Sequence, residues 1–203
     1  PITSGFEDTT TTYTNAGKVR NQGLEMSLHT INLTGELGWE TNVTATYNKN
    51  KIKDLNSAVP YYINQINNSY VTMLAKDYPI NAFYGYVTDG LFQNQAEVDA
   101  HAVQPGAEPG DIRFRDLNND GVINDSDRTV IGNPNPCWFF SMNNNLSYKG
   151  FELSVFFQGV AGNKIYNANN IDNVGMAAAY NQTTDVLNRW RGEGTSYSMP
   201  RAV

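Results

Sequence analysis

Alternating apolar and polar residues mark two hairpins in the sequence. From Leu37 to Asn48 the period is two, which predicts a β-strand with one apolar and one polar face. The apolar face carries Leu37, Trp39, Thr41, Val43, Ala45 and Tyr47, and the polar face carries Glu36, Gly38, Glu40, Asn42, Thr44, Thr46 and Asn48. The stretch from Val19 alternates in the same way, and a turn at Asn32 to Gly35 joins the two stretches. Residues 18–48 are therefore predicted to form one antiparallel hairpin.

A second hairpin is predicted over residues 137–162. Phe140 to Tyr148 alternates, Lys149-Gly150 supplies a two-residue turn, and the stretch from Phe151 to Phe157 alternates again. Both hairpins have short turns, so their strands are expected to be antiparallel neighbours.

Aromatic residues stand at both ends of the apolar stripes. Trp39 and Tyr47 lie eight residues apart, which is roughly 26 Å at the usual rise of a strand. Strands of a membrane barrel show this pattern because aromatic girdles flank their apolar band. A soluble sandwich strand with one face in a core would show it too, so the pattern alone leaves both open.

The remaining segments are more polar and less regular. We expect a loop from Pro1 to Gly17 and a long loop from Leu55 to Pro79, with one helical turn near residues 71–76. Short strands are predicted at residues 83–87, 112–114 and 129–131, a turn at Asp89-Gly90, and a short helix at residues 95–100. A further helix is predicted between residues 176 and 190, within the polar segment 163–203.

Composition narrows the classes of function. The 203 residues carry a net charge of −6 and 12% aromatic residues, with only 17% charged residues, which suits a β-rich chain and disfavours a nucleic-acid partner. The single cysteine, Cys137, excludes an internal disulfide. No apolar run is long enough for a membrane helix. No nucleophile–base pair or pair of acid/base carboxylates stands out, so the chain is not expected to be an enzyme.

One loop has the spacing of a calcium site. Oxygen-bearing residues fall at positions 1, 3, 5, 9 and 12 of the stretch 116–127, with glycine at position 6, which resembles the loops of EF-hand and dockerin proteins. The expected ligands are Asp116, Asn118, Asp120, the Val122 carbonyl, Asn124 and Asp127. Ile123 would anchor the loop in a small sheet. The alternative is an Asn/Asp-Gly turn without metal.

Four runs of sequence resemble the SusC/RagA family of TonB-linked outer-membrane proteins. They are NAGKVRNQGLEMSL from Asn15, FYGYVTDGLFQNQAEVDAH from Phe83, PGDIRFRDLNNDGVINDSDRTVIGNPNP from Pro109 and LSYKGFELSVFFQGVAGNKIYN from Leu146. The resemblance implies an all-β fragment of a transmembrane β-barrel in the outer membrane of a Bacteroidetes-type bacterium. It also implies import of oligosaccharides or peptides with a SusD-like surface lipoprotein, and contact with TonB through segments absent from this chain.

Within such a barrel the chain would contribute wall, lumen and outer loops. Four strands cannot close a barrel, so the remaining strands are expected elsewhere. The two short turns would lie on the periplasmic side, which places residues 49–136 and 163–203 outside the cell. Candidate substrate- or partner-binding residues are the loop tyrosines Tyr61, Tyr62, Tyr84 and Tyr86 and the lumen-facing Glu40 and Asn143.

The alternative is a soluble, calcium-stabilised β-sandwich that binds carbohydrate or mediates adhesion. In that module the loop tyrosines and Trp138 would stack on sugar rings. Such a module should be soluble and monomeric on expression, whereas a barrel fragment should aggregate without detergent.

Overall fold

The computed structural model describes residues 17–202 and divides the chain into two compact units. The first unit comprises Pro1–Tyr61, Leu74–Ile80 and Asn135–Gly162, and the second comprises Tyr62–Met73, Asn81–Pro134 and Asn163–Val203. The loop expected from Pro1 to Gly17 lies outside the described residues except for Gly17, where the first strand begins. Within residues 17–202, no helix has the length and apolar character needed to cross a membrane.

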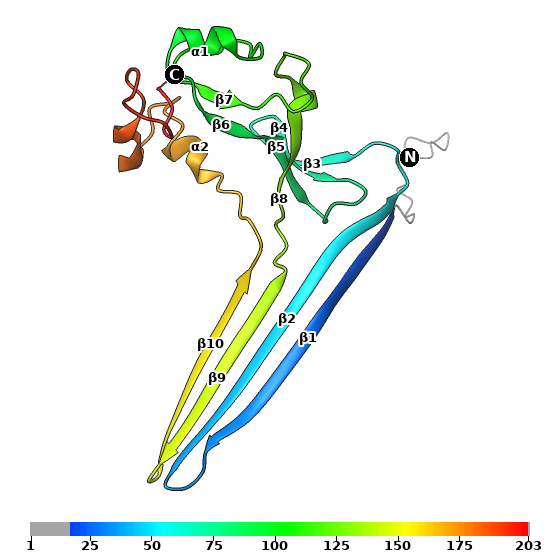
Figure 1. Ribbon diagram of the computed structural model, residues 1–203, viewed down its shortest axis with the longest axis vertical. Coiled ribbons are helices and arrows are strands. Elements are labelled where there is room, and N and C mark those ends of the chain that lie inside the picture. Colours follow the sequence, from blue (N-terminus) through cyan, green and yellow to red (C-terminus); the bar gives the residue numbers. More distant parts are fainter. Residues whose placement is uncertain (1–16, 203) are drawn as a thin grey trace, which may run out of the picture. The chain divides into compact units, whose positions relative to one another are not determined.

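A four-stranded antiparallel sheet forms most of the first unit. Its strands are β1 (Gly17–Leu33), β2 (Leu37–Leu55), β9 (Trp138–Tyr148) and β10 (Phe151–Ala161), in the order β1-β2-β9-β10 (Figure 1). Both predicted hairpins are therefore present, and β2 and β9 join them. Leu37 pairs with Tyr148, so the β1–β2 and β9–β10 turns lie at the same end of the sheet.

β2 continues past Asn48, where the sequence suggested that the strand ends in a run of lysines. It reaches Leu55 because its pairing with β1 continues to Gly17, across a register shift next to Ile52, which is buried. The Ile52 amide donates to the Tyr78 carbonyl at 2.9 Å, and the Asp77 amide donates to the Ile52 carbonyl at 2.9 Å. The segment Leu74–Ile80 thus covers this end of the strand. An ion pair of 2.9 Å between Lys51 and Asp77 adds to the contact.

The strand register gathers apolar side chains on one face of the sheet. Cross-strand pairing places Leu28, Val43, Met142 and Phe157 in one row across the four strands. Side chains next to them in sequence point to the opposite face, where Ser27, Thr44, Ser141 and Gln158 form a row. Of the described residues, the only buried hydrophobic in these four strands is Ile52, and the side chains of the apolar face are exposed or half-buried.

The second unit contains two small sheets and a short helix. β3 (Tyr61–Ile66), β4 (Ser69–Leu74), β5 (Ala82–Tyr86) and β8 (Arg128–Gly132) form one sheet in the order β3-β4-β5-β8. β6 (Thr88–Leu91) pairs with β7 (Ile112–Phe114), and α1 spans Gln95–Ala100. The predictions of β5, β7, β8 and α1 are confirmed. The unit's buried hydrophobic residues are Met73, Ala82, Leu91, Phe92 and Ile123.

Three local predictions are wrong. Residues 71–76 are not a helical turn, because β3 and β4 form a hairpin around Asn67 and Asn68, whose φ values of 46° and 61° suit a tight turn. Asp89-Gly90 lies inside β6, where the register shifts, and Gly90 has a φ of 89°. Residues 176–190 form only a 3-10 helix at Thr184–Asn188, and an α-helix, α2, lies earlier at Asn169–Asn173. The few apolar residues there do not repeat over enough turns to stabilise a longer helix.

Candidate functional site

The loop 116–127 is closed by its own hydrogen bonds. The Asp116 carboxylate accepts from the Asn119 amide at 2.7 Å and from the Gly121 amide at 2.9 Å. Asn118 Oδ1 accepts from the Asp120 amide at 3.0 Å, and the Asp120 carboxylate accepts from the Val122 amide at 2.9 Å. Gly121 has a φ of 82°, which a glycine adopts without strain. The sharp bend expected at this glycine is present.

Asp127 anchors the end of the loop. Its side chain is fully buried, and its two oxygens accept from the Leu117 amide at 2.8 Å and the Asn124 amide at 2.9 Å. The amides of Asn124 and Leu117 hold the pKa of the Asp127 carboxyl below its usual value, because they stabilise the charged form. Ile123 is buried, and its amide donates to the Val103 carbonyl at 2.9 Å. Ile123 therefore anchors the loop as expected, but through the isolated bridge between Val103 and Val122 and not in a small sheet.

The donor chemistry of the loop suits a hard cation, since its side chains offer carboxylate and amide oxygens. However, the described residues contain no group of three or more histidine, cysteine, aspartate or glutamate side chains placed to hold a metal ion. The oxygens of Asp116, Asp120 and Asp127 are instead engaged by backbone amides. Calcium binding by Asp116, Asn118, Asp120, Val122, Asn124 and Asp127 stays a prediction.

Next to this loop, the second unit has a pocket of about 370 Å³ lined by six polar or aromatic residues, Tyr62, Tyr70, Tyr84, Asp125, Ser126 and Arg128. β3, β4 and β5 each supply a tyrosine, and β8 supplies the arginine. The 3-10 turn Asp125–Asp127 supplies the other two residues. The Tyr62 ring lies 4.9 Å from the Tyr84 ring and 6.0 Å from the Tyr70 ring. The loop therefore forms part of the pocket's rim.

Arg128 contacts residues on several sides of the pocket. Its guanidinium lies 4.6 Å from the ring centre of Tyr84 and 5.5 Å from that of Tyr86. Its Nη2 donates to the Tyr70 carbonyl at 2.7 Å, and its Nη1 lies 3.6 Å from an Asp125 carboxylate oxygen. The contacts join β4, β5 and β8 to the end of the loop.

The tyrosine hydroxyls of β5 remain protonated at neutral pH. Burial, together with the neighbouring Tyr62, raises the pKa of Tyr84 to about 12. Burial, together with the charge of Asp125, also raises the pKa of Tyr86. Both hydroxyls therefore act as donors, Tyr84 to the Asp125 carbonyl at 3.5 Å and Tyr86 to the Asp125 carboxylate at 3.4 Å.

The structure brings together part of the predicted set of tyrosines. Tyr62 and Tyr84 line the pocket, and Tyr86 reaches it through Arg128 and Asp125. Tyr61, the first residue of β3, does not line the pocket. Sequence reasoning missed four lining residues, Tyr70, Asp125, Ser126 and Arg128. The spacing of Tyr62 and Tyr70 about the Asn67-Asn68 turn was the one signal that could have added Tyr70.

Glu40 and Asn143 lie on the polar face of the long sheet. Glu40 pairs across the strands with Asn145, and its carboxylate lies 3.7 Å from His29 Nε2. Asn143 accepts from the Ser154 hydroxyl at 3.0 Å and donates to Asn145 Oδ1 at 3.2 Å. These polar groups form a hydrogen-bonded surface. Glu40, Asn145 and Ser154 are among the residues that line a hollow of about 760 Å³, whereas Asn143 does not line it.

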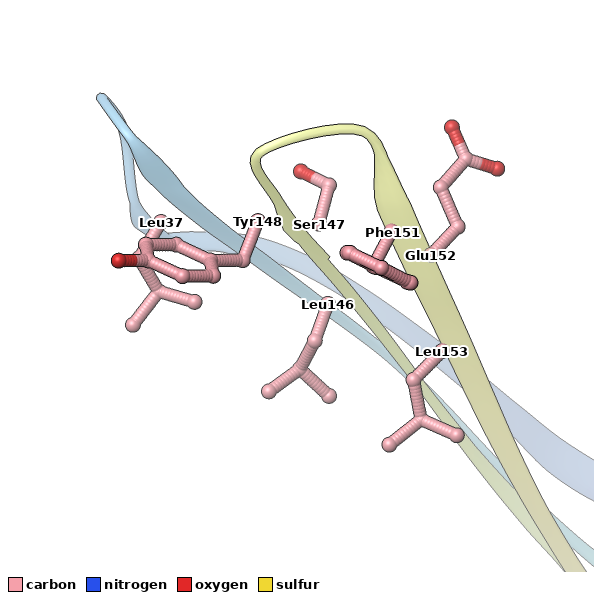
Figure 2. Close-up of a pocket in the computed structure, with 7 residues that line it drawn as sticks. All are labelled: Leu37, Leu146, Ser147, Tyr148, Phe151, Glu152 and Leu153. Carbon is pink, nitrogen blue, oxygen red and sulfur yellow. The ribbon is translucent and has the colours of Figure 1, made fainter.

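The apolar face has a shallow hollow of its own near the turns. About 580 Å³ in volume, it lies against Leu37, Leu146, Tyr148, Phe151 and Leu153. Figure 2 shows Leu146 and Leu153 projecting to one side of the strands and Ser147 and Glu152 to the other. The hollow offers almost only carbon to whatever contacts it, as the surrounding apolar face does.

No protein-family model matches the chain, but known proteins do. It is 31% identical over 191 residues to TonB-dependent receptor P26 of Formosa agariphila, covering 93% of this chain and 19% of that protein. Receptor P3 of the same organism is 32% identical, and the match covers 92% of this chain and 19% of receptor P3. TonB-dependent receptor SusC of Bacteroides thetaiotaomicron is 24% identical, and the match covers 84% of this chain and 17% of SusC.

Solved structures show the same fold. The structure of the RagAB peptide transporter contains a chain that matches with a TM-score of 0.72 and 18% identity, over 92% of this chain and 20% of that one. The RagAB peptide importer in its closed-closed state matches with a TM-score of 0.67 and 19% identity, over 94% and 20%. The chain thus spans about one fifth of the length of the proteins it matches.

Proposed function

Because the chain belongs to the SusC/RagA family of TonB-dependent receptors, which reside in the bacterial outer membrane, we propose that its two hairpins form four neighbouring strands in the wall of a transmembrane β-barrel. The observation that carries this proposal is the apolar face of the sheet. It runs across all four strands, its side chains are exposed or half-buried, and it lies opposite a polar face. The remaining strands lie in other parts of the receptor, because four strands leave two unpaired edges that lipid does not tolerate.

Aromatic residues bound the apolar face at both ends. Tyr47 and Trp138 are cross-strand partners with ring centres 4.9 Å apart, and Tyr148 pairs with Phe151 at the other end. Tyr47 and the Leu37–Tyr148 pair are separated by ten residues of β2, about 33 Å along a strand. At the tilt of about 40° found in barrels this spans about 25 Å, the height of an apolar membrane band.

The polar face would line the interior of the barrel. Glu40, Asn143 and their neighbours present carboxylate, amide and hydroxyl groups there, which suits passage of a hydrated substrate. We propose import of oligosaccharides or peptides with a SusD-like surface lipoprotein, and coupling to TonB through other parts of the receptor. The support is the likeness to SusC and to a chain of the RagAB peptide transporter. The relatives are receptors and transporters, which confirms the prediction that the chain is not an enzyme.

The two short turns would face the periplasm, which puts residues 49–136 outside the cell. Cysteine labelling of intact cells tests this in the full-length receptor, in a Cys137→Ser background. Ser126→Cys, which is exposed, should react with a membrane-impermeant thiol reagent on whole cells. Lys149→Cys, in the β9–β10 turn, should react only after lysis. A Ser126→Cys receptor that is protected on whole cells but reacts after lysis without unfolding would refute the topology.

The soluble-sandwich alternative is disfavoured by the same apolar face. A sandwich buries the inner face of each sheet under a second sheet, whereas Leu24, Met26, Phe140 and Leu153 are all more than half exposed. The purified chain should therefore aggregate without detergent. Recovery of a stable monomer from aqueous buffer would revive the alternative.

We further propose that the loop 116–127 binds Ca²⁺ through the oxygens of Asp116, Asn118, Asp120, Val122, Asn124 and Asp127. The support is the ligand spacing and the bend at Gly121. An ion that binds only the folded state stabilises it by about 2.7 kcal/mol at a hundredfold excess over its dissociation constant. Calcium should raise the melting temperature of the purified receptor, Asp120→Ala should abolish the rise, and Asp99→Ala on α1 should not. No rise in the unaltered receptor would leave the loop as a turn.

A further inference from the structure

We propose that the pocket formed by Tyr62, Tyr70, Tyr84, Asp125, Ser126 and Arg128 binds a neutral sugar ring. The barrel wall makes no use of this pocket, which lies in the second compact unit. The inference rests on the proposed function in one respect only, which is that the proposed topology puts the pocket outside the cell. The chemistry of the ligand follows from the pocket itself.

Three tyrosine rings form the wall of the pocket. The planes of Tyr62 and Tyr84 are inclined by 42°, and those of Tyr62 and Tyr70 by 39°, so the rings enclose a concave surface. Tyr62 and Tyr70 are 42% and 40% exposed, which leaves their faces open to a ligand. The C–H groups on one side of a sugar ring carry partial positive charge and complement the negative face of an aromatic ring. The volume of about 370 Å³ falls within the roughly 300–1,000 Å³ of small-ligand pockets.

The charges of the pocket select against an ionic ligand. Tyrosines around a hollow could hold an ammonium group, but the guanidinium of Arg128 already lies over Tyr84 and Tyr86. That fixed cation repels a cationic ligand. An anion is not favoured either, because the Asp125 carboxylate lies 3.6 Å from Arg128 and offsets its charge. A neutral ligand is the one that neither charge repels.

The polar groups favour hydroxyls over a peptide backbone. The Tyr70 carbonyl already accepts from Arg128, and the Asp125 carbonyl already accepts from Tyr84. These carbonyls are therefore not available to pair with the backbone of a peptide ligand. The side chains that face a ligand are the hydroxyl of Ser126 and the carboxylate of Asp125, which also contacts Tyr86 and Arg128 but is 89% exposed. Closely spaced side-chain donors and acceptors match the adjacent hydroxyls of a sugar ring.

Binding can be measured on the full-length receptor purified in detergent. The probes are a printed array of neutral and acidic glycans and, for peptides, a tryptic digest of casein. The neutral glycan with the strongest array signal is then titrated by calorimetry. Tyr62→Ala and Tyr70→Ala each remove one ring of the wall, Tyr62→Phe keeps the ring, and Ser126→Trp fills the pocket without removing any ring. The matched control is Tyr180→Ala, an exposed tyrosine of the same unit outside the pocket.

A neutral glycan should bind, and loss of either ring should weaken it about tenfold or more. Ser126→Trp should abolish binding, while Tyr62→Phe and Tyr180→Ala should stay within about threefold of the unaltered receptor. Circular dichroism identifies a variant that has unfolded. If an alanine variant unfolds, the affinities of Ser126→Trp and Tyr62→Phe decide whether the pocket binds the glycan. The proposal is overturned if no neutral glycan binds, if Ser126→Trp leaves its affinity unchanged, or if only the peptides or acidic glycans depend on the pocket. Because binding needs no transport, a receptor that fails the labelling test above refutes the topology and leaves this result standing.

Discussion

A lysine placed at the centre of the apolar face should destabilise the receptor strongly, and one placed at its edge should not. Val43 pairs with Met142 and lies four residues from Tyr47 and six from Leu37, near the middle of the band. A lysine facing lipid costs about 2–4 kcal/mol at the midplane of a bilayer and about 0–1 kcal/mol near the interfaces. We expect the larger cost for Val43→Lys and the smaller for Tyr47→Lys.

The matched control is Asn42→Lys, one residue away on the polar face. In a water-filled interior this lysine keeps its hydration, so the free energy of unfolding should change by less than about 1 kcal/mol. The assay is guanidinium unfolding of the full-length receptor refolded into lipid vesicles, followed by tryptophan fluorescence. Equal losses at residues 42 and 43 would refute the two-faced assignment. Equal losses at residues 43 and 47 would refute the dependence on depth, and with it the placement in a bilayer.

Three further changes probe single contacts. The folded state holds the pKa of the Asp127 carboxyl below its unfolded value of about 3.9. The ionised carboxylate therefore stabilises the fold above that pH, and this stabilisation is lost as the pH falls through the folded pKa. Asp127→Asn should flatten this part of the acid-unfolding curve. Gly159→Val should cost about 1–3 kcal/mol in vesicle unfolding, because the Phe140 ring fills the space of a side chain there. Gly110→Ala should cost at least about 1–3 kcal/mol in thermal unfolding, since Gly110 has a φ of 93° and lies against Trp190.

Each change has a control that isolates its cause. Asp120→Asn alters an exposed aspartate of the same loop and should leave the acid-unfolding curve closer to that of the unaltered receptor. Phe140→Ala should recover part of the stability lost in Gly159→Val, and additive losses would contradict the contact. Gly106→Ala shares the left-handed backbone, with a φ of 74°, but meets nothing within 4 Å. It should therefore cost less than the change at Gly110.

The long hairpins could be predicted because their information is local. Alternation over ten or more residues and a short turn determine both the strand and its partner, as in β9 and β10. The end of β2 was harder, because its burial depends on a segment more than twenty residues later, through the bond between Ile52 and Tyr78. The lysines of that stretch interrupt the pattern, and Ile52 is out of phase with the apolar residues from Leu37 to Tyr47.

The pocket could be predicted only in part for the same physical reason. Aromatic residues in polar loops are visible in a sequence, and Tyr62 and Tyr84 were found in this way. Arg128 could not be, since its bond to the Tyr70 carbonyl spans 58 residues and depends on how four short strands order themselves. Propensity says little about that order. The loop 116–127 lies between these cases: its bend at Gly121 follows from local chemistry, whereas the burial of Asp127 depends on its neighbours.

The pairing of β2 with β9 has a consequence for how such receptors diversify. The pairing of β2 with β9 ends at Tyr47 and Trp138, although β2 goes on pairing with β1 as far as Leu55, and at that point the Asn48 amide donates to the Cys137 carbonyl at 2.8 Å. Neighbouring strands are only about 4.8 Å apart, so the intervening segment behaves as a cassette whose two ends already meet. A cassette of another length could be grafted at this seam without shifting the hydrogen-bond ladder between β2 and β9. If this segment lies outside the membrane and binds a ligand as proposed, its specificity could change by recombination while the four strands stay the same.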